Sequence, residues 1–171
     1  AKDGWDDDVP PKHLFDLLRE ITEYQIIWGG NYFELPPSSS FLVWDKVQPE
    51  QFTLAMAELA WTNINKPAKI WRWKSMSING GLAKYHPTQK PEQLMKWCIQ
   101  QLPKETVTIL DPFMGSGTTG VACAKMGRKF IGIELDEDYF NIACKRIEEA
   151  YRSPDMFIEA AKKAEQVIME I

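Results

Sequence analysis

Two acidic residues, Asp111 and Glu134, stand where a carboxylate can bind a ligand. Asp111 directly follows an apolar run at 107–110, and the turn after it contains Gly115 and Gly117. Glycines there allow a sharp turn and the close approach of a ligand, which a Cβ would prevent. Glu134 follows about 20 residues later, where an acidic side chain can accept hydrogen bonds from both hydroxyls of a ribose. The spacing therefore predicts a site for a cofactor that contains adenosine.

The residues around the turn also discriminate between such cofactors. No Gly-Lys-Ser/Thr follows the glycines, so the turn is not a P-loop. A carboxylate at Asp111 would repel a pyrophosphate at the helix N-terminus, but it would suit a cationic amino-acid group. S-adenosylmethionine has such a group and NAD does not, so the pattern favours S-adenosylmethionine. An NAD-linked oxidoreductase, and a turn whose small residues serve packing alone, stay open as alternatives.

The elements that must position these residues follow from periodicity. Buried strands are predicted at 107–110 and 130–133 with a helix at 118–126 between them, which is a βαβ half-unit with a ligand-binding first turn. Further strands are predicted at 24–28 and 41–44, and further helices at 10–21, 49–60, 91–102, 138–151 and 154–171, with Asp8 as a cap for the first of them. Helices that alternate with short strands predict an α/β fold with a parallel-rich sheet and helices on both faces.

Three segments in this chain order resemble the amino-methyltransferases of DNA. They are His86-Pro87-Thr88-Gln89-Lys90-Pro91, the run from Asp111 to Thr119, and Gly132-Ile133-Glu134-Leu135-Asp136. The segments 26–33 and 41–46 also resemble that family. More narrowly, the chain is similar to the circularly permuted class, in which the catalytic half precedes the cofactor half, and the resemblance covers residues 5 to 150.

This resemblance implies a Rossmann-like, S-adenosylmethionine-dependent methyltransferase fold and a DNA partner. The methyl group would pass from S-adenosyl-L-methionine to an exocyclic amine of a base flipped out of double-stranded DNA, without a metal. Segments 28–32 and 86–91 look more like the adenine-N6 members than the cytosine-N4 members, and Asn31 would face the site from the catalytic half. Cofactor-binding roles are implied for Thr88, Gln89, Lys90, Asp111, Phe113, Gly115, Ser116, Gly117, Thr118, Glu134, Leu135 and Asp136. Thr88 has an alternative role as a cap of the helix that begins at Pro91.

The catalytic tetrapeptide of this family, Asp/Asn/Ser-Pro-Pro-Tyr/Phe, does not occur in the sequence. Val9-Pro10-Pro11-Lys12 has the prolines but neither flanking group. We therefore expect the catalytic residues upstream of Ala1, and we expect the chain without them to transfer no methyl groups. The alternative is a catalytically inactive relative that binds cofactor or DNA.

The net charge of −4 argues against a nucleic-acid partner, but its distribution does not. No Asp or Glu occurs between Glu58 and Glu92, where cations and aromatic residues alternate. DNA contacts are predicted for Lys66, Lys69, Arg72, Lys74 and Lys84, with Trp61, Trp71, Trp73 and Tyr85 as stacking groups. The alternative is a solvated hairpin whose tryptophans pack inward.

The remaining composition fits one methyltransferase domain of 171 residues. We divide it into a catalytic half (1–60), a short target-recognition insert (61–85), a cofactor half (86–150) and a C-terminal helix (151–171). No apolar run approaches the ~20 residues that span a bilayer, and the acidic N-terminus is no signal peptide, so we expect a cytoplasmic protein. Cys98, Cys123 and Cys144 suit reduced thiols, and two histidines make a zinc site improbable. A role in restriction–modification and a homodimer are compatible with these features.

Overall fold

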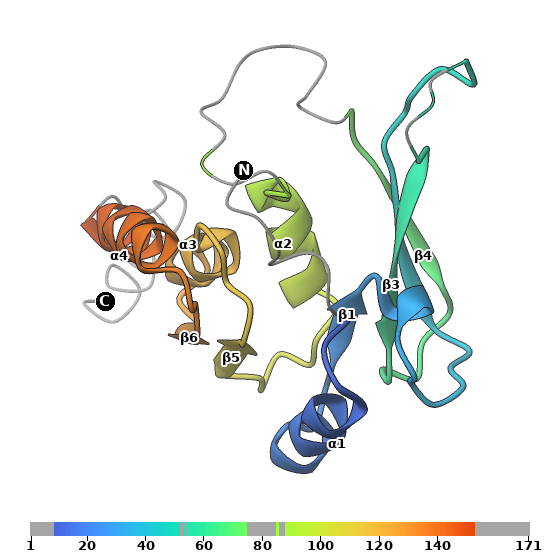
Figure 1. Cartoon of the computed structure of the whole chain (residues 1–171), viewed down its shortest axis with the longest axis horizontal. Helices are drawn as coiled ribbons and strands as arrows, with labels where there is room; N and C mark the ends of the chain where they lie inside the picture. The colour runs from blue at the N-terminus through green and yellow to red at the C-terminus, as the bar shows by residue number, and fades with distance from the viewer. Residues whose placement is uncertain (1–8, 52, 54, 75–84, 86–87, 153–171) are drawn as a thin grey trace, which may run out of the picture. The chain divides into compact units, whose positions relative to one another are not determined.

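The structure, a computed structural model of the whole chain, describes residues 9–51, 53, 55–74, 85 and 88–152 (Figure 1). The chain divides into two compact units, Ala1–Gly80 and Gly81–Ile171. Asp8, Lys84, His86, Pro87 and the predicted helix at 154–171 lie outside the described residues.

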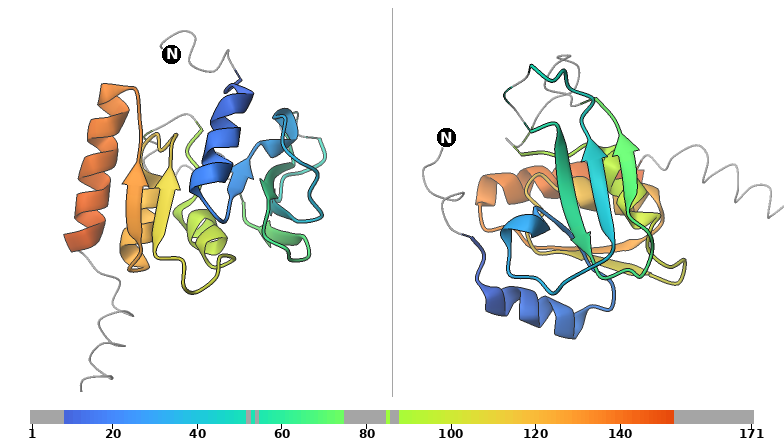
Figure 2. Two further views of the ribbon diagram at one scale, coloured as in Figure 1. Left: turned by 90° about the horizontal axis from the view of Figure 1, so that it is seen from below. Right: turned by 90° about the vertical axis from the view of Figure 1, so that its right-hand side faces the viewer.

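The first unit contains a four-stranded mixed sheet. Its elements are α1 (Lys12–Ile21), β1 (Ile26–Trp28), η1 (Gly30–Tyr32), β2 (Phe41–Asp45), β3 (Ala57–Thr62) and β4 (Lys69–Arg72). The strand order is β1-β3-β2-β4, in which β3 is antiparallel to both neighbours and β4 is parallel to β2 (Figure 2, right). Leu42 and Trp44 alternate with half-exposed residues in β2 and are buried, so one face of this strand forms the core of the unit.

The helix predicted at 49–60 is wrong, because the second part of this segment forms β3. The apolar residues Phe52, Met56 and Leu59 suggested a helical face, but the backbone of Ala57–Thr62 bonds to a strand on each side. A central strand gains hydrogen bonds along both edges, and this tertiary gain exceeds the weak helical preference of alanine, glutamate and leucine.

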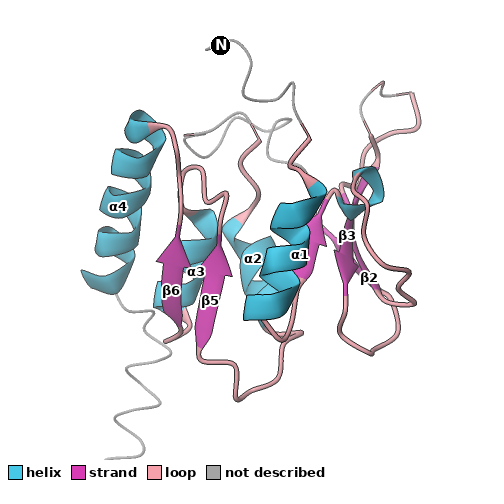
Figure 3. Ribbon diagram, turned by 60° about the horizontal axis from the view of Figure 1, so that its bottom comes forward, coloured by secondary structure: helices cyan, strands magenta, loops and turns pink. Residues whose placement is uncertain are grey.

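The second unit contains the predicted βαβ half-unit. Its elements are α2 (Glu92–Ile99), β5 (Thr108–Asp111), α3 (Thr118–Lys125), β6 (Lys129–Gly132) and α4 (Glu137–Arg152). The strands β5 and β6 are parallel and lie side by side, with Asp111 opposite Gly132 at their carboxyl ends (Figure 3). The helix α3 packs against β6, and both α2 and α4 pack against α3. Three elements predicted at 107–133 are thus confirmed to within about one residue at each end.

Burial in β6 is lower than the sequence suggested. Phe130 is half-buried, but Ile131 is 55% exposed and Ile133 is also exposed. The prediction of a buried strand at 130–133 is therefore wrong for Ile131 and Ile133. The helix α3 covers the side of the two-stranded sheet to which Phe130 points, while Ile131 points to the other side. Within the described residues, no helix has the length and apolar character needed to cross a membrane.

Candidate functional site

The glycine turn, defined here as residues 112–117, connects β5 to α3. Gly115 and Gly117 have φ angles of +51° and +76°, which L-residues with a side chain rarely adopt. A Cβ at Gly117 would lie 2.8 Å from the Cβ of Ala143 in α4, so the second unit also has no room for a side chain there. The turn is therefore fixed both by its backbone conformation and by close packing on α4.

The carboxylate of Asp111 is held at the start of α3. Its Oδ1 accepts a hydrogen bond from the backbone N–H of Phe113 at 3.1 Å, and its Oδ2 accepts one from the hydroxyl of Thr119 at 2.6 Å. A negative charge near a helix N-terminus is stabilised by the exposed N–H groups there. The acidic group predicted at the strand end is thus rigidly placed beside the glycine turn.

The carboxylate of Glu134 ties the end of β6 to the same turn. Its Oε2 accepts a hydrogen bond from the backbone N–H of Gly115 at 2.8 Å. Its Oε1 accepts two more, from the N–H groups of Leu135 at 2.8 Å and Asp136 at 2.9 Å. Since a carboxylate has about four acceptor positions, Oε2 retains capacity for a further donor such as a hydroxyl group.

The two residues after Glu134 have different surroundings. The side chain of Leu135 is 96% exposed, so its apolar surface is available to a ligand. Asp136 caps α4, because its Oδ1 accepts hydrogen bonds from the N–H groups of Asp138 and Tyr139 at 2.9 and 3.2 Å. A cofactor contact by Asp136 would therefore have to coexist with this capping role.

Ser116 connects the glycine turn to the segment around Gln89. Its side chain is only 3% exposed, and its hydroxyl donates to Oε1 of Gln89 at 3.2 Å. The same Oε1 accepts the backbone N–H of Tyr85 at 3.0 Å. Arg146 of α4 donates from Nη1 to the hydroxyl of Ser116 at 2.9 Å and to the carbonyl of Ser116. Two sequence segments implied in cofactor binding are thus brought together.

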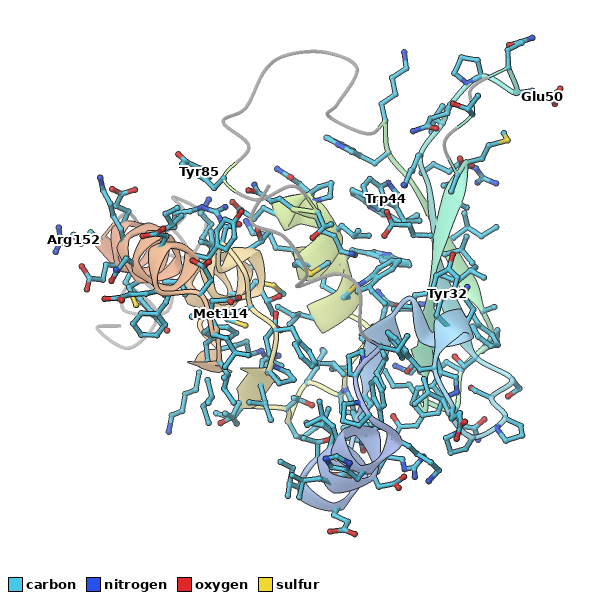
Figure 4. All side chains as sticks on the ribbon, viewed as in Figure 1. Tyr32, Trp44, Glu50, Tyr85, Met114 and Arg152 are labelled. Atoms are coloured by element: carbon cyan, nitrogen blue, oxygen red, sulfur yellow. The ribbon has the colours of Figure 1, made fainter. Side chains whose placement is uncertain are left out.

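Arg146 is a residue that the sequence did not identify. Its guanidinium lies over the ring of Tyr85, 4.9 Å from the ring centre, and burial lowers the pKa of this group from its ordinary value (the side chains are drawn in Figure 4). In the sequence it is one of several charged residues on an amphipathic helix. It differs from the exposed cations of the same helix only in its position opposite the glycine turn.

The other predicted cofactor residues surround this centre. Thr118 begins α3, is buried, and lies 3.4 Å from Nη1 of Arg146. Phe113 and Thr88 are exposed, and Lys90 is half-buried. The N-cap of α2 is Pro91, which makes no side-chain capping bond. These positions leave Phe113 and Thr88 accessible to a ligand.

The three cysteines are free thiols, with Cys98 and Cys123 buried and Cys144 half-buried. Burial, together with the charge of Asp111, raises the pKa of the Cys123 thiol to about 12. This thiol is therefore neutral near pH 7 and is a packing group rather than a nucleophile. Among the described residues, His, Cys, Asp and Glu do not form a cluster that could hold a metal ion.

Four of the five predicted DNA-binding cations belong to the first unit. Lys66, Lys69, Arg72 and Lys74 are all exposed, and Lys84 lies outside the described residues. Nε of Arg72 forms an ion pair with Asp45 at 3.3 Å, so its charge is partly compensated.

The four aromatic residues predicted as stacking groups have different surroundings. Trp61 was predicted to stack on bases, and this is wrong: it is 5% exposed, and its Nε1 donates to the carbonyl of Pro36 at 2.8 Å. Its position in the central strand β3 places it in the core. Trp71 and Trp73 stack on each other at 5.4 Å, with Trp73 44% exposed, whereas Tyr85 contacts Arg146. The inward-packing alternative therefore holds for Trp61 and does not hold for Trp73.

Comparison with known proteins gives a consistent family. The sequence profile of a family described as DNA methylase matches residues 16–145. The type II methyltransferase M2.DpnII of Streptococcus pneumoniae is 56% identical over 63 residues, which are 37% of this chain and 24% of that protein. M2.LlaDCHI of Lactococcus lactis subsp. cremoris, also a type II methyltransferase, is 44% identical over 88 residues, which are 51% of this chain and 29% of that protein.

A solved structure shares the fold. The cytosine-N4-specific PvuII DNA methyltransferase superposes with a TM-score of 0.50 and 16% identity, covering 67% of this chain and 56% of that one. This similarity confirms the predicted Rossmann-like α/β fold. The chain matches less than a third of the length of the two type II relatives.

Proposed function

Because the chain belongs to the DNA methylase family, we propose that the protein transfers a methyl group from S-adenosylmethionine to an exocyclic amine of a DNA base. The observation that carries this proposal is the placement of two acidic side chains on one glycine turn. Asp111 is fixed to Phe113 and Thr119 on one side, and Glu134 is fixed to Gly115 on the other. Together they suit a cofactor with a cationic end and a ribose.

The geometry of Asp111 favours this cofactor over NAD. A pyrophosphate would approach the N–H groups at the start of α3, and the carboxylate of Asp111 lies beside them, bonded to the hydroxyl of Thr119 in the first turn of that helix. An ammonium group would instead be attracted to that carboxylate. Glu134 can still accept a ribose hydroxyl on Oε2, and the exposed side chain of Leu135 offers apolar contact to an adenine ring.

The chain's own residues then bind and orient rather than carry the chemistry. When bound, S-adenosylmethionine supplies an electrophilic methyl group on a sulfonium, which passes to the amine nitrogen while the amine loses one proton. Asp111 would hold the amino-acid end and Glu134 the ribose, so that the methyl group points in a fixed direction. The base itself must leave the stack to reach it.

We favour adenine N6 over cytosine N4 as the target atom. The support is the resemblance of segments 28–32 and 86–91 to the adenine-modifying members. Nucleoside analysis of DNA methylated by the protein distinguishes N6-methyladenine from N4-methylcytosine. Cofactor binding without methylation would favour the alternative of a catalytically inactive relative that binds cofactor or DNA.

Calorimetry with S-adenosylhomocysteine and NAD tests the cofactor. We expect S-adenosylhomocysteine to bind and NAD to bind at least tenfold more weakly, a difference of about 1.4 kcal/mol, because Asp111 repels the pyrophosphate. Tighter binding of NAD would overturn the proposal in favour of an oxidoreductase.

We also propose that the basic strand surface, defined as Lys66, Lys69, Arg72 and Lys74, contacts DNA phosphates. All four side chains are exposed, and β4 is an edge strand of its sheet. The exposed ring of Trp73 continues this surface and could stack on an unpaired base.

Replacing Arg72 and Lys74 by alanine should weaken DNA binding and flatten its salt dependence. We expect the slope of log K against log salt to fall by about one to two units, since each phosphate contact contributes about 0.9. The lower value applies if the ion pair with Asp45 already compensates Arg72. Fluorescence anisotropy with a labelled duplex, over a series of salt concentrations, measures the slope.

A matched control removes the same residue types elsewhere in this unit. Lys12 and Arg19 of α1 both pair with Asp16, so alanine at these two positions also deletes one lysine and one arginine. We expect the control to keep the slope of the unmodified protein. Equal slopes for both double variants and the unmodified protein would show that the basic strand surface does not contact DNA phosphates.

A further inference from the structure

Arg146 closes a ring of contacts in the second unit. Its Nη1 donates to the hydroxyl of Ser116, that hydroxyl donates to Gln89, Gln89 accepts the N–H of Tyr85, and the ring of Tyr85 lies against the guanidinium. Nη1 also approaches the hydroxyl of Thr118 at 3.4 Å. Four residues from three separate parts of the sequence thus hold one another.

The partners of this guanidinium are unusual for a half-buried charge. Among the described residues, the groups in direct contact are a carbonyl, two hydroxyls and an aromatic face, all of them uncharged. Glu92 and Glu149 act on it only through longer-range electrostatic attraction. Removing a cation from water costs free energy that neutral partners repay only in part, so net stability does not account for Arg146.

The contacts of Arg146 converge on the glycine turn. Ser116 lies between Gly115, whose N–H is bonded to Glu134, and Gly117, whose backbone packs on Ala143. Through Gln89 the same hydroxyl reaches the backbone N–H of Tyr85. Arg146 therefore contacts the glycine turn directly, reaches Gln89 through Ser116, and also lies on the ring of Tyr85.

We propose that Arg146 is a positioning residue, which preorganises the glycine turn and the side chains of Tyr85 and Gln89 for the amino-acid end of the cofactor. This inference rests on the proposed function. Ordering two segments before binding lowers the entropy that binding must cost, and this raises the affinity. The effect concerns the end of the cofactor near Ser116 and Gly117, because the ribose end would be held separately by Glu134, which follows β6.

The test compares two ligands that share the ribose and adenine. S-adenosylhomocysteine carries the amino-acid end, and adenosine lacks it. We expect Arg146→Met to weaken S-adenosylhomocysteine about tenfold and adenosine less than twofold. Arg146→Lys should lie in between, because lysine retains the charge but lacks the planar guanidinium that lies over the ring of Tyr85. Calorimetry with each ligand measures both affinities.

The control is Arg152→Met on the same helix. Arg152 is 78% exposed at its side chain and pairs with Glu148 at 3.6 Å, away from the glycine turn. We expect it to leave both affinities unchanged. Equal loss of both ligands in Arg146→Met would indicate general destabilisation, and no loss of either would also overturn the proposal.

Hydrogen exchange separates this inference from the proposed function. In the protein without ligand, the amides of Tyr85 and Gly117 should exchange faster in Arg146→Met than in Arg152→Met, since these N–H groups belong to the segments that Arg146 orders. Unchanged exchange would refute the positioning role. Failure of the unmodified protein to bind S-adenosylhomocysteine would refute the proposed function and would leave this exchange test intact.

A second variant tests the same contact at an exposed residue, in case Arg146→Met does not fold. Tyr85→Leu removes the aromatic face from Arg146, and Tyr85 is exposed, so its replacement spares the core. We expect the same selective loss of S-adenosylhomocysteine, about threefold because the hydrogen bonds of Arg146 to Ser116 remain. Equal affinities for the variant and the unmodified protein would show that the contact between Tyr85 and Arg146 does not contribute to cofactor binding, contrary to the proposal.

Discussion

Replacing Glu134 by glutamine should weaken the binding of S-adenosylhomocysteine by about 10- to 100-fold, which is about 1.4–2.8 kcal/mol. The substitution keeps the size of the side chain and removes one acceptor oxygen. Three backbone N–H groups, of Gly115, Leu135 and Asp136, now bond to the two oxygens of Glu134. A glutamine that places its oxygen toward two of them must turn its NH₂ group toward the third.

Both orientations of the glutamine carry a cost. With its NH₂ group toward Gly115, two donors face each other, the glycine turn loses its tie to β6, and a ribose hydroxyl loses its acceptor. With its NH₂ group toward Leu135 and Asp136, two N–H groups lose their partner at the start of α4. Affinity should therefore fall although the side chain still fits.

Glu137→Gln is the matched control for this experiment. Glu137 is exposed in the first turn of α4, so the change alters the net charge equally and leaves the glycine turn intact. Calorimetry should show no more than a twofold effect for this control. If both glutamine variants bind S-adenosylhomocysteine as tightly as the unmodified protein, Glu134 does not contact the cofactor.

The βαβ half-unit was predictable from the sequence because its signals are local. The runs 107–110 and 130–133 are short, apolar and bounded by turn residues, and the helix between them starts directly after Gly117. The contact between Gly115 and Glu134 follows from the same logic, since parallel neighbours place their carboxyl ends at one edge.

The remaining features depend on partners that are distant in the sequence. The strand β3 becomes a strand because β1 and β2 pair with it, and Trp61 enters the core because Gly30 and Pro36 cover it. Arg146 receives its position from Ser116 and Tyr85, which are far from it along the chain. Local pattern carries no information on such contacts, so the sequence alone could not predict them.

The largest expected effect on stability comes from Gly117→Ala. This change should lower the free energy of unfolding by about 2–5 kcal/mol, from two sources. A φ of +76° costs an alanine roughly 1–2 kcal/mol, and overpacking against a neighbouring element costs about 1–3 kcal/mol. The new Cβ would lie 2.8 Å from the Cβ and 3.0 Å from the Cα of Ala143, so backbone must move. Urea denaturation followed by circular dichroism measures the change.

Gly127→Ala separates the two sources. Gly127 follows α3 with a φ of +66°, and a Cβ there would meet no atom within 4 Å. This variant should lose only the conformational part, about 1–2 kcal/mol. The difference between the two variants then measures the packing of the glycine turn on α4.

Adding Ala143→Gly to Gly117→Ala should recover part of that difference, because one of the two clashing carbons is removed while the Cα remains. Equal losses for Gly117→Ala and Gly127→Ala would mean that α4 yields to the extra methyl group, and the turn would then be held by Glu134 and Arg146 rather than by contact with Ala143.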